Sequence, residues 1–452
     1  MTTAAPQSVQ NTPRRYRPYP RYKDSGVEWL GEIPAHWEVK RLKHLCSRSA
    51  VYGANEPADA YESEGARFLR TTDITDGGRL VGDGVYLPVD TVHGYLLEDG
   101  DILFSRSGTI GRSFLYRKSL HGACAYAGYL VRFVPGPMLD SCFAFYFSKS
   151  KSFERWLGGA VIASTIGNVN GQKFANVEMP CPPYNDQRAI AAFLDRETAR
   201  IDAMIEKKRR QIELLQEKRA ALISHAVTKG LDPNAPMRDS GVEWLGEIPA
   251  DWEVKRLKYL ATLNPESLAD DTDPTLEMVY VDIGGVDNLG RIGEREQLTF
   301  ASAPSRARRL VRDGDVILST VRTYLRAIAP IRNPEPGMVV STGFAVVRPE
   351  DDLTTDYAAY ALRAPYFVER IVANSKGVSY PAINESEIAT YELAGPPLPE
   401  QRAIAAFLDR ETARIDALAE KVEKSIDLLR EYRTALISAA VTGKIDVREE
   451  AA

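Results

Sequence analysis

Two stretches of this sequence occur twice, and this internal repeat constrains the fold more than any other feature. The segment DSGVEWLGEIPAHWEVKRLKHL at 24–45 returns at 239–260 with two substitutions, and QRAIAAFLDRETARIDA at 187–203 returns unchanged at 401–417. Self-similarity at a fixed distance marks repeated structural units. The chain must therefore fold as two copies of one architecture.

The two repeated segments, here named A and B, enclose two stretches that are not repeated. The order along the chain is A–X–B–A–Y–B, with X at 46–181 and Y at 261–395. X and Y share little identity beyond Asp-Gly-Asp tripeptides at 99–101 and 313–315, where Asp-Gly predicts a tight turn into a strand. Because a repeated surface performs one task twice and divergent surfaces perform different tasks, we expect X and Y to share a fold and bind different targets.

The fold class predicted for X and Y is α+β. Alternating or β-rich runs predict strands, and longer stretches with helical periodicity predict helices. The expected strands include 67–70, 129–134, 278–282 and 344–347, and the expected helices are 141–157 and 355–373.

Segment B predicts a long helix in each copy. Pro-Pro pairs at 182–183 and 396–397 block helix before each start, and Gly230 and Gly443 suit the C-terminal stops. About 40 residues of helix span roughly 60 Å, so each helix needs a partner along its length. We expect the two helices to pair as an antiparallel coiled coil that relates the two copies by a pseudo-two-fold axis.

The seam of this coiled coil is predicted from apolar residues at seven-residue and companion spacings. In the first copy, where Lys208 interrupts the series, the seam residues are Leu194, Ile201, Ile205, Ile212, Leu215 and Leu222. In the second copy they are Leu408, Ile415, Val422, Ile426, Leu429 and Leu436.

Composition fits a soluble multidomain protein. At 452 residues the chain is long enough for two or three domains, and 44% hydrophobic with 26% charged residues is a globular balance. No apolar run reaches the length of a membrane span. The basic segment 1–23, expected to be a flexible arm, lacks the apolar core of a secretory signal, so we expect a cytoplasmic protein. Four scattered cysteines without a CxxC pair, and five histidines without an HExxH motif, suggest neither a disulfide framework nor a metal site.

Charge is unevenly distributed along the chain. The formal net charge of −5 counts against nucleic-acid binding by the chain as a whole. Cations nevertheless gather at matching places in X and Y: 105–118 holds four cations and no acid, and 305–326 holds six arginines and two acids.

Four motifs together resemble the specificity subunit of type I restriction-modification systems. They are EWLGEIPxxWEVKRLK, the GDILFSRSGTIG segment at 100–111, PPxxxQRAIAAFLD and the ending VTGKIDVR, and the likeness covers nearly the whole chain from Tyr22 onward. The resemblance implies two target-recognition domains, each reading one half of a bipartite site in double-stranded DNA. It also implies that the helices dock two methyltransferase subunits, which two restriction/translocase subunits join. S-adenosylmethionine, ATP and Mg would be bound on those partners, with no cofactor in this chain.

On this basis the chain divides into parts whose boundaries the repeat supplies. They are a flexible basic arm at 1–23, a first target-recognition domain at 24–181 that includes segment A at 24–45, a central helical region at 182–232, a second target-recognition domain at 239–395 that includes segment A at 239–260, and a distal helical region at 396–446.

Two groups of polar and basic residues in each variable segment are the candidates for DNA contact, one in the cation-rich stretch and one further along the chain, before a helix. Arginine suits guanine or phosphate, and Ser, Thr and Tyr reach either. The candidates in X are Arg106, Ser107, Thr109, Arg112, Asn168, Asn170 and Lys173. Those in Y are Arg306, Arg308, Thr320, Arg322, Thr323, Tyr324, Arg326, Lys376 and Tyr380. For any one of them, a solvated polar loop is an equally good interpretation.

No catalytic centre is predicted in this chain. The CPPY sequence at 181–184 looks like the NPPY-type loop of adenine methyltransferases, but cysteine is a weak acceptor for the target amine, and the second copy at 395–398 also lacks the aromatic. No GxxxxGK[ST] phosphate loop occurs, and the carboxylates show no recognisable nuclease spacing. Two alternatives stay open: a self-contained DNA methyltransferase or nuclease, and a coiled-coil scaffold without DNA specificity.

Segment A also holds four tryptophans, Trp29, Trp37, Trp244 and Trp252. Residues that stack on bases would vary with the target, whereas these do not differ between the copies. We therefore expect them to anchor segment A against the helices or a partner.

Overall fold

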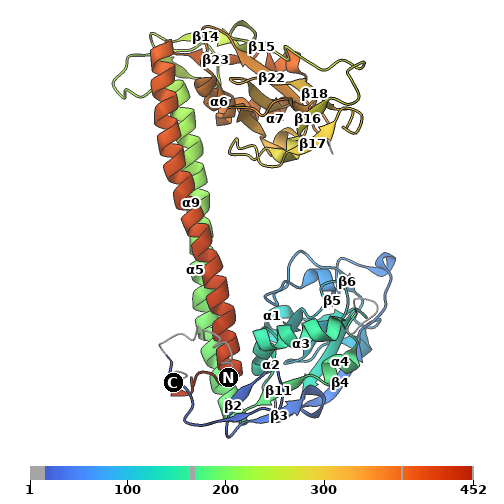
Figure 1. The fold of residues 1–452 in the computed structure, drawn as a ribbon. Helices are drawn as coiled ribbons and strands as arrows, with labels where there is room; N and C mark the ends of the chain where they lie inside the picture. The colour runs from blue at the N-terminus through green and yellow to red at the C-terminus, as the bar shows by residue number, and fades with distance from the viewer. Residues whose placement is uncertain (1–15, 163–167, 378–379, 450–452) are drawn as a thin grey trace, which may run out of the picture. The chain divides into compact units, whose positions relative to one another are not determined.

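The computed structural model describes residues 16–162, 168–377 and 380–449 (Figure 1). The chain forms two compact units. The first runs up to Lys208 and resumes at Lys424, and the second runs from Arg209 to Glu423. Each unit thus holds one copy of segment A, one variable segment and part of each long helix. Most of the predicted N-terminal arm, residues 1–15, lies outside the described part of the chain. The rest of it is packed rather than flexible, which corrects the prediction for 16–23: Tyr19 is 2% exposed, and Tyr22 begins a strand that pairs with 32–34.

The first unit builds X from two small sheets. One is antiparallel, with the strand order β4 (Cys46–Tyr52), β10 (Leu130–Pro135), β7 (Ile102–Ser105) and β8 (Ser113–Leu115). The other has the order β6 (Tyr86–Leu87), β5 (Ala66–Leu69) and β9 (Cys124–Tyr126), with β5 and β9 parallel. The short helices of this segment are α1 (Lys118–His121), α2 (Ser141–Phe147), α3 (Lys151–Ile162) and α4 (Gly171–Ala175).

The second unit builds Y on the same plan. One sheet has the order β15 (Ala261–Leu263), β22 (Phe344–Pro349), β19 (Val316–Ser319) and β20 (Ile328–Pro330). The other has the order β17 (Glu296–Thr299), β16 (Glu277–Val281), β21 (Met338–Ser341) and β18 (Ala307–Leu310), with β16 and β21 parallel. The short helices are α6 (Thr355–Arg363), α7 (Pro365–Asn374) and α8 (Glu385–Ile388). The α+β class and the common fold of X and Y are confirmed.

Both helices expected in the variable segments are divided in two. The stretch 141–157 forms α2 and α3, and 355–373 forms α6 and α7. Pro365 begins α7, because a residue without an N–H group suits the first helical turn. In X, the Ser150 hydroxyl accepts a hydrogen bond from the N–H of Phe153 at 3.2 Å and so caps the start of α3.

The Asp-Gly-Asp turns are confirmed, and they hold a buried ion pair that the sequence did not reveal. The glycines of the two turns have φ of 91° and 92°. The second aspartate of each turn, Asp101 or Asp315, is 1% exposed. Asp101 binds Arg132 of β10 at 2.7 Å, and Asp315 binds Arg348 of β22 at 2.8 Å. The sequence similarity between X and Y at these turns therefore corresponds to an Asp–Arg ion pair that both domains form.

Segment A forms short strands that pair in the same way in both units. In the first unit β1 (Tyr22–Asp24) pairs with β2 (Glu32–Pro34), and β3 (Glu38–Arg41) pairs with β11 (Glu178–Cys181). In the second unit β12 (Met237–Asp239) pairs with β13 (Glu247–Pro249), and β14 (Glu253–Arg256) pairs with β23 (Glu392–Gly395). In both units the last strand leads directly into a long helix.

Two tryptophans of segment A anchor it to the ends of the long helices, as predicted. Trp37 and Trp252 are buried. Trp37 lies beside Gly443, just after the second long helix, and Trp252 lies beside Gly230, just after the first. The other two tryptophans of segment A contact side chains that belong to X and Y.

The long helices are α5 (Tyr184–Lys229) and α9 (Leu398–Val441), which start directly after the Pro-Pro pairs. Gly230 and Gly443 follow them with φ of 74° and 71°, values in the left-handed region that favours glycine. The predicted helix starts and stops are confirmed.

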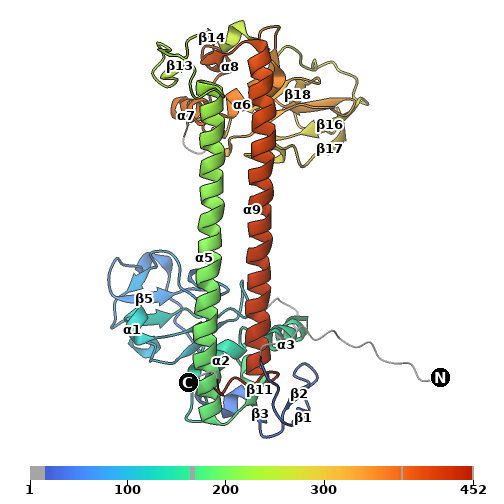
Figure 2. The same cartoon turned by 90° about the vertical axis from the view of Figure 1, so that its left-hand side faces the viewer.

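In each unit α5 and α9 lie side by side and run in opposite directions (Figure 2). Arg433 of α9 donates to Asp202 of α5 at 3.0 Å in the first unit. Arg219 of α5 donates to Asp416 of α9 at 3.1 Å in the second. The two ion pairs use equivalent residues of the two copies, so each unit holds α5 against α9 in the same way.

All twelve predicted seam residues are buried or half-buried, and Leu408 belongs to the hydrophobic core that α9 shares with Y. The buried seam residues are Leu194, Ile201, Ile205, Leu408, Ile415, Val422, Ile426 and Leu436. The half-buried ones are Ile212, Leu215, Leu222 and Leu429. On α5 the half-buried residues all follow Lys208, the position at which the sequence interrupts the series.

Candidate nucleic-acid interface

The turn between β7 and β8 in X and the turn between β19 and β20 in Y occupy the same place in their sheets. Arg106 donates its backbone N–H to the carbonyl of Tyr129 at 3.0 Å, and Thr320 donates its own to the carbonyl of Gly343 at 2.8 Å. The two basic stretches are therefore equivalent in backbone position. The same backbone position carries an arginine in X and a threonine in Y.

Arg106 is the centre of the candidate surface in X. Its guanidinium lies over the ring of Tyr52, with 5.1 Å between Cζ and the ring centroid. Among the residues that the structure describes, Arg106 Nε and the Thr109 hydroxyl are buried without a hydrogen-bond partner. An unpaired buried polar group costs about 1–3 kcal/mol.

Two tyrosines of this surface were not predicted as contact residues. Tyr52 is 40% exposed and Tyr129, whose carbonyl binds the Arg106 N–H, is 62% exposed. They come from β4 and from the residue before β10, far apart in the sequence. The sequence offered a signal only for Tyr129, which begins the strand expected at 129–134.

In Y, the corresponding arginine and aromatic come from different positions. The guanidinium of Arg322 lies 4.9 Å from the ring centroid of Tyr380, which is 65% exposed. Arg322 and Arg326 have φ of 51° and 53°, in the left-handed region. Such strain in non-glycine residues concentrates at functional sites, because the surrounding structure must impose it.

A cavity of about 380 Å³ in Y brings three predicted residues together. Arg306, Arg322 and Tyr380 line it, with Ile283 and Val321 among its apolar residues. Asp282 also borders it and was not predicted as a site residue. The cavity thus combines cations, an aromatic ring and an apolar lining.

Arg306 is held in place by Asp282. Its Nε and Nη2 donate to the two carboxylate oxygens at 3.2 and 3.1 Å, and Nε also donates to the Tyr280 hydroxyl at 3.1 Å. Burial acts to raise the pKa of Asp282, but hydrogen bonds from Arg306 and the backbone outweigh it and keep that pKa below its usual value. A charged carboxylate therefore orients the arginine, whose side chain is 55% exposed.

The structure corrects the prediction for two threonines of Y. Thr320 is 7% exposed and its hydroxyl donates to the carbonyl of Gly343 at 3.0 Å. Thr323 is 2% exposed and its hydroxyl bonds that of Ser375 at 2.9 Å. Neither side chain reaches the surface, so neither is a direct DNA contact in this conformation.

Four other predicted residues have roles inside their domains. The side chain of Asn170 accepts from the N–H of Lys173 at 2.9 Å and caps α4. The ammonium of Lys173 donates to the carbonyl of Ala160 at 2.9 Å. The remaining two, which form ion pairs with acids of their own domains, are Arg112 with Asp76 and Arg308 with Asp270.

The last five candidates differ in exposure. Tyr324, Arg326 and Lys376 have exposed side chains in Y, and Ser107 and Asn168 are half-buried in X. Contact of the three exposed side chains with DNA stays a prediction.

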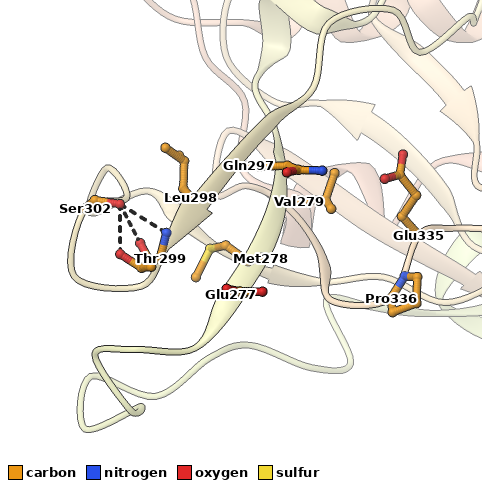
Figure 3. Close-up of a pocket in the computed structure, with 9 residues that line it drawn as sticks. All are labelled: Glu277, Met278, Val279, Gln297, Leu298, Thr299, Ser302, Glu335 and Pro336. Atoms are coloured by element: carbon orange, nitrogen blue, oxygen red, sulfur yellow. Dashed lines mark hydrogen bonds between the residues drawn. The ribbon is translucent and has the colours of Figure 1, made fainter.

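A second cavity of Y, of about 530 Å³, lies along β16 and β17 (Figure 3). Its lining includes the carboxylates of Glu277 and Glu335. None of the residues that line it is a cation or a predicted contact residue, so we assign this cavity no part in DNA binding.

Two cysteine thiols of X are protonated at neutral pH. Burial raises the pKa of Cys46 to about 12 and that of Cys124 to about 11, which keeps both thiols protonated. Within the described ranges, no group of three or more His, Cys, Asp or Glu side chains is placed to hold a metal ion. Among those same residues, no helix has both the length and the apolarity that crossing a membrane requires.

Comparison with known families identifies the class of this protein. The profile described as "Type I restriction modification DNA specificity domain" matches residues 34–214 and 249–427, which is most of the chain. The chain therefore belongs to this family, and X and Y are its two target-recognition domains, called recognition domains below.

The chain is similar over nearly its full length to specificity subunits of named systems. It is 23% identical over 435 residues to the type I restriction enzyme MjaVIII specificity subunit of Methanocaldococcus jannaschii, covering 92% of this chain and 94% of that protein. It is 18% identical over 430 residues to the EcoKI specificity subunit of Escherichia coli, covering 92% and 90%.

Solved structures show the same fold. A chain in "Structural basis underlying complex assembly and conformational transition of the type I R-M system" matches with a TM-score of 0.68 and 17% identity, covering 91% of this chain and 99% of that one. The HsdS subunit from Thermoanaerobacter tengcongensis matches with a TM-score of 0.51 and 17% identity, covering 91% and 98%.

Proposed function

We propose that this chain reads a bipartite site in double-stranded DNA, with X reading one half and Y the other, and that it is itself non-catalytic. The proposal rests on one observation: X and Y have the same backbone fold but present different side chains at its surface. X offers Arg106 over Tyr52, and Y offers Arg322 over Tyr380 beside Arg306. Guanidinium groups suit guanine edges and phosphates, and exposed aromatic rings add apolar contact.

The long helices supply a repeated surface for repeated partners. Met204 of α5 and its equivalent Leu418 of α9 are 37% and 44% exposed, and Leu214 and its equivalent Leu428 are 49% and 64% exposed. Exposed apolar side chains on helices that already bury another face favour protein docking. We assign these positions to the docking of two methyltransferase subunits, one on each copy.

The rest of the complex follows from that docking. Two restriction/translocase subunits would join through the methyltransferase subunits, and S-adenosylmethionine, ATP and Mg would be bound on those partners. The whole complex would act in the cytoplasm.

Sequencing of methylated bases in cells that express this chain with its methyltransferase partner tests the reading function. The expected result is a two-part motif with a fixed gap. Replacing residues 46–181 with the corresponding segment of a relative should change one half of the motif and leave the other intact. A change in both halves would contradict the assignment of one half to each domain.

Incubation of the purified chain alone with labelled S-adenosylmethionine and mixed DNA separates this proposal from a self-contained methyltransferase. We expect no methyl transfer until the partner is added. Transfer by the chain alone would establish the alternative.

Docking is tested by co-purification of the methyltransferase subunit. Leu214→Asp with Leu428→Asp should abolish co-purification, because each adds a charge to an apolar contact. Leu276→Asp, at a leucine of Y that is 41% exposed, is the matched control and should leave it unchanged. Normal co-purification by the double variant would exclude this surface.

A further inference from the structure

Each recognition domain contacts its long helix through residues that segment B repeats without change. On the helix these residues are Gln, Asp, Thr and Asp, at 187, 195, 198 and 202 of α5 and at 401, 409, 412 and 416 of α9. X and Y share little sequence, yet both units form the same set of contacts with these residues.

The glutamine holds the domain through main-chain atoms. Gln187 is fully buried, and its Oε1 accepts from the N–H of Asp140 at 2.9 Å while Nε2 donates to the carbonyl of Met138 at 3.0 Å. Gln401 binds Thr354 and Asp352 in the same way, each at 2.8 Å. Main-chain recognition accepts any side chain, so this contact tolerates divergence in X and Y.

The first Asp and the Thr hold a tyrosine of the domain. In the first unit the Tyr146 hydroxyl donates to Asp195 at 2.6 Å and lies 3.1 Å from the Thr198 hydroxyl. Burial and the neighbouring carboxylate raise the pKa of Tyr146, so the phenol keeps its proton and donates. The second unit repeats the arrangement at 2.7 and 3.3 Å with Tyr360, Asp409 and Thr412.

The second Asp holds an arginine from a hairpin of the domain. In the first unit Arg79 binds one oxygen of Asp202 at 2.7 Å, while the other oxygen accepts from Arg433 of the partner helix at 3.0 Å. In the second unit Arg291 binds Asp416 at 3.1 Å, and Arg219 of the partner helix binds the other oxygen at 3.1 Å. Each carboxylate thus joins three elements: its own helix, the partner helix and the recognition domain.

We propose that Arg79 and Tyr146 in X, and Arg291 and Tyr360 in Y, are positioning residues that fix the orientation of each recognition domain on its helix. Domains with different DNA-reading surfaces then adopt one pose, which sets the spacing of the half-sites. This inference rests on the proposed function, because spacing has meaning only for a two-part target.

The exposure of the arginines indicates that orientation, rather than stability, is what they contribute. The side chains of Arg79 and Arg291 are 69% and 61% exposed. Ion pairs this exposed add little to the stability of a fold, because water screens them and the side chains lose freedom. Y and α9 share one hydrophobic core, which includes Tyr360, Ile404 and Leu408. Loss of the exposed ion pair leaves this core intact, so it should loosen the hairpin that carries Arg291 without unfolding the domain.

The test uses the complete complex of this chain with its methyltransferase partner, carrying Arg291→Ala, Tyr360→Phe or both. Methylation rates are measured on DNA with the wild-type gap and with gaps one base pair longer and shorter. In the double variant we expect discrimination against the wrong gaps to fall about tenfold or more, since a misplacement of ~1 Å can cost about 100-fold in rate. Preference for the bases of each half-site should be unchanged, and Arg291→Lys should restore part of the discrimination.

Two variants of Y serve as matched controls. Arg295 forms an ion pair with Glu335 instead of with a helix. The buried hydroxyl of Tyr366 has no hydrogen-bond partner among the described residues. Arg295→Ala and Tyr366→Phe should both keep the wild-type discrimination. Unchanged gap discrimination in the double variant, or an equal loss in the controls, would overturn the proposal.

A measurement without DNA separates failure of this inference from failure of the proposed function. Hydrogen–deuterium exchange of the free full-length chain should speed up in the hairpin at 283–292 when Arg291 becomes alanine and stay unchanged when Arg295 does. Unchanged exchange in that hairpin would overturn the positioning role even if the complex reads a two-part site. A wild-type complex that methylates no two-part motif would instead overturn the proposed function.

Discussion

Arg322 offers a substitution that separates DNA reading from stability. Its φ of 51° costs a non-glycine residue about 1–2 kcal/mol, which glycine relieves. Against this gain, glycine loses about 0.5–1 kcal/mol through the greater freedom of its unfolded chain. Loss of the exposed contact with the Tyr380 ring costs about 0.5–1 kcal/mol. These effects nearly cancel, so Arg322→Gly should leave the free energy of unfolding within about 1 kcal/mol of the wild-type value.

The effect of Arg322→Gly on DNA binding should be larger and confined to one half-site. Loss of a bidentate arginine contact to a base costs about 1–3 kcal/mol, or about 5–150-fold in affinity. The measurements are affinities of the assembled complex for sites with single-base changes in each half, together with thermal unfolding of the free chain. Arg322→Ala is the comparison, because it loses the same contact but keeps the backbone strain, and it should be the less stable variant.

Two results would refute this reasoning. Wild-type affinity and specificity in Arg322→Gly would show that the arginine does not contact DNA. Relaxed specificity in the half-site that X reads would show that the two domains do not read separate halves.

Three further perturbations have expected outcomes. Asp315→Asn should destabilise the second unit by about 1–3 kcal/mol in chemical denaturation, because it weakens two hydrogen bonds from Arg348 to a buried carboxylate, although Arg348 keeps its ion pair with Glu266. Asp282→Asn, at a more exposed pair, should cost about 1 kcal/mol or less, and similar losses in the two variants would contradict this. Ile415→Glu should weaken assembly of the whole complex in size-exclusion chromatography, because it buries an unpaired carboxylate between the helices. Normal assembly of this variant would argue against the predicted coiled-coil seam. Burial, with Arg433 and Arg112 nearby, lowers the pKa of Lys149 to about 7. Between pH 7 and about 10 the unfolded state therefore holds a proton that the folded state has released, so the stability of the first unit should rise with pH in this range. Lys149→Met should flatten that rise, and an equal slope in both proteins would count against this explanation.

The fold could be predicted from the sequence wherever the signal was local or repeated. Pro-Pro pairs, terminal glycines and seven-residue spacing located α5 and α9, because helix starts, stops and seams depend on neighbours in sequence. The same reasoning missed the pairing of Asp101 with Arg132, which joins a turn to a strand that lies further along the chain. The division between α6 and α7 depends on Pro365, a signal that was present but that the apolar periodicity obscured.

The candidate sites were harder to predict because exposure depends on neighbours that the sequence does not place. Arg306, Arg322 and Tyr380, three of the predicted contact residues, line one cavity of Y. Thr320 comes from the same basic stretch, but its hydroxyl donates a hydrogen bond to the carbonyl of Gly343, next to the adjacent strand, and so is not available to DNA. Asp282 was missed because an acid is an unpromising DNA contact until the structure shows that it orients an arginine.

Residues of segment B are identical in the two copies for two different structural reasons, and the sequence alone cannot tell which reason applies to which residue. Ile201, a predicted seam residue, is buried, whereas its neighbour Asp202 binds a recognition domain and the partner helix together. The complementary residues lie in the divergent segments, where Tyr146 and Tyr360 stand among unrelated neighbours. Divergence in X and Y is therefore limited where the helix holds the domain and free where the surface faces a target. Exposed variable residues that make no contact with segment B are, by this reasoning, the set in which DNA specificity is encoded.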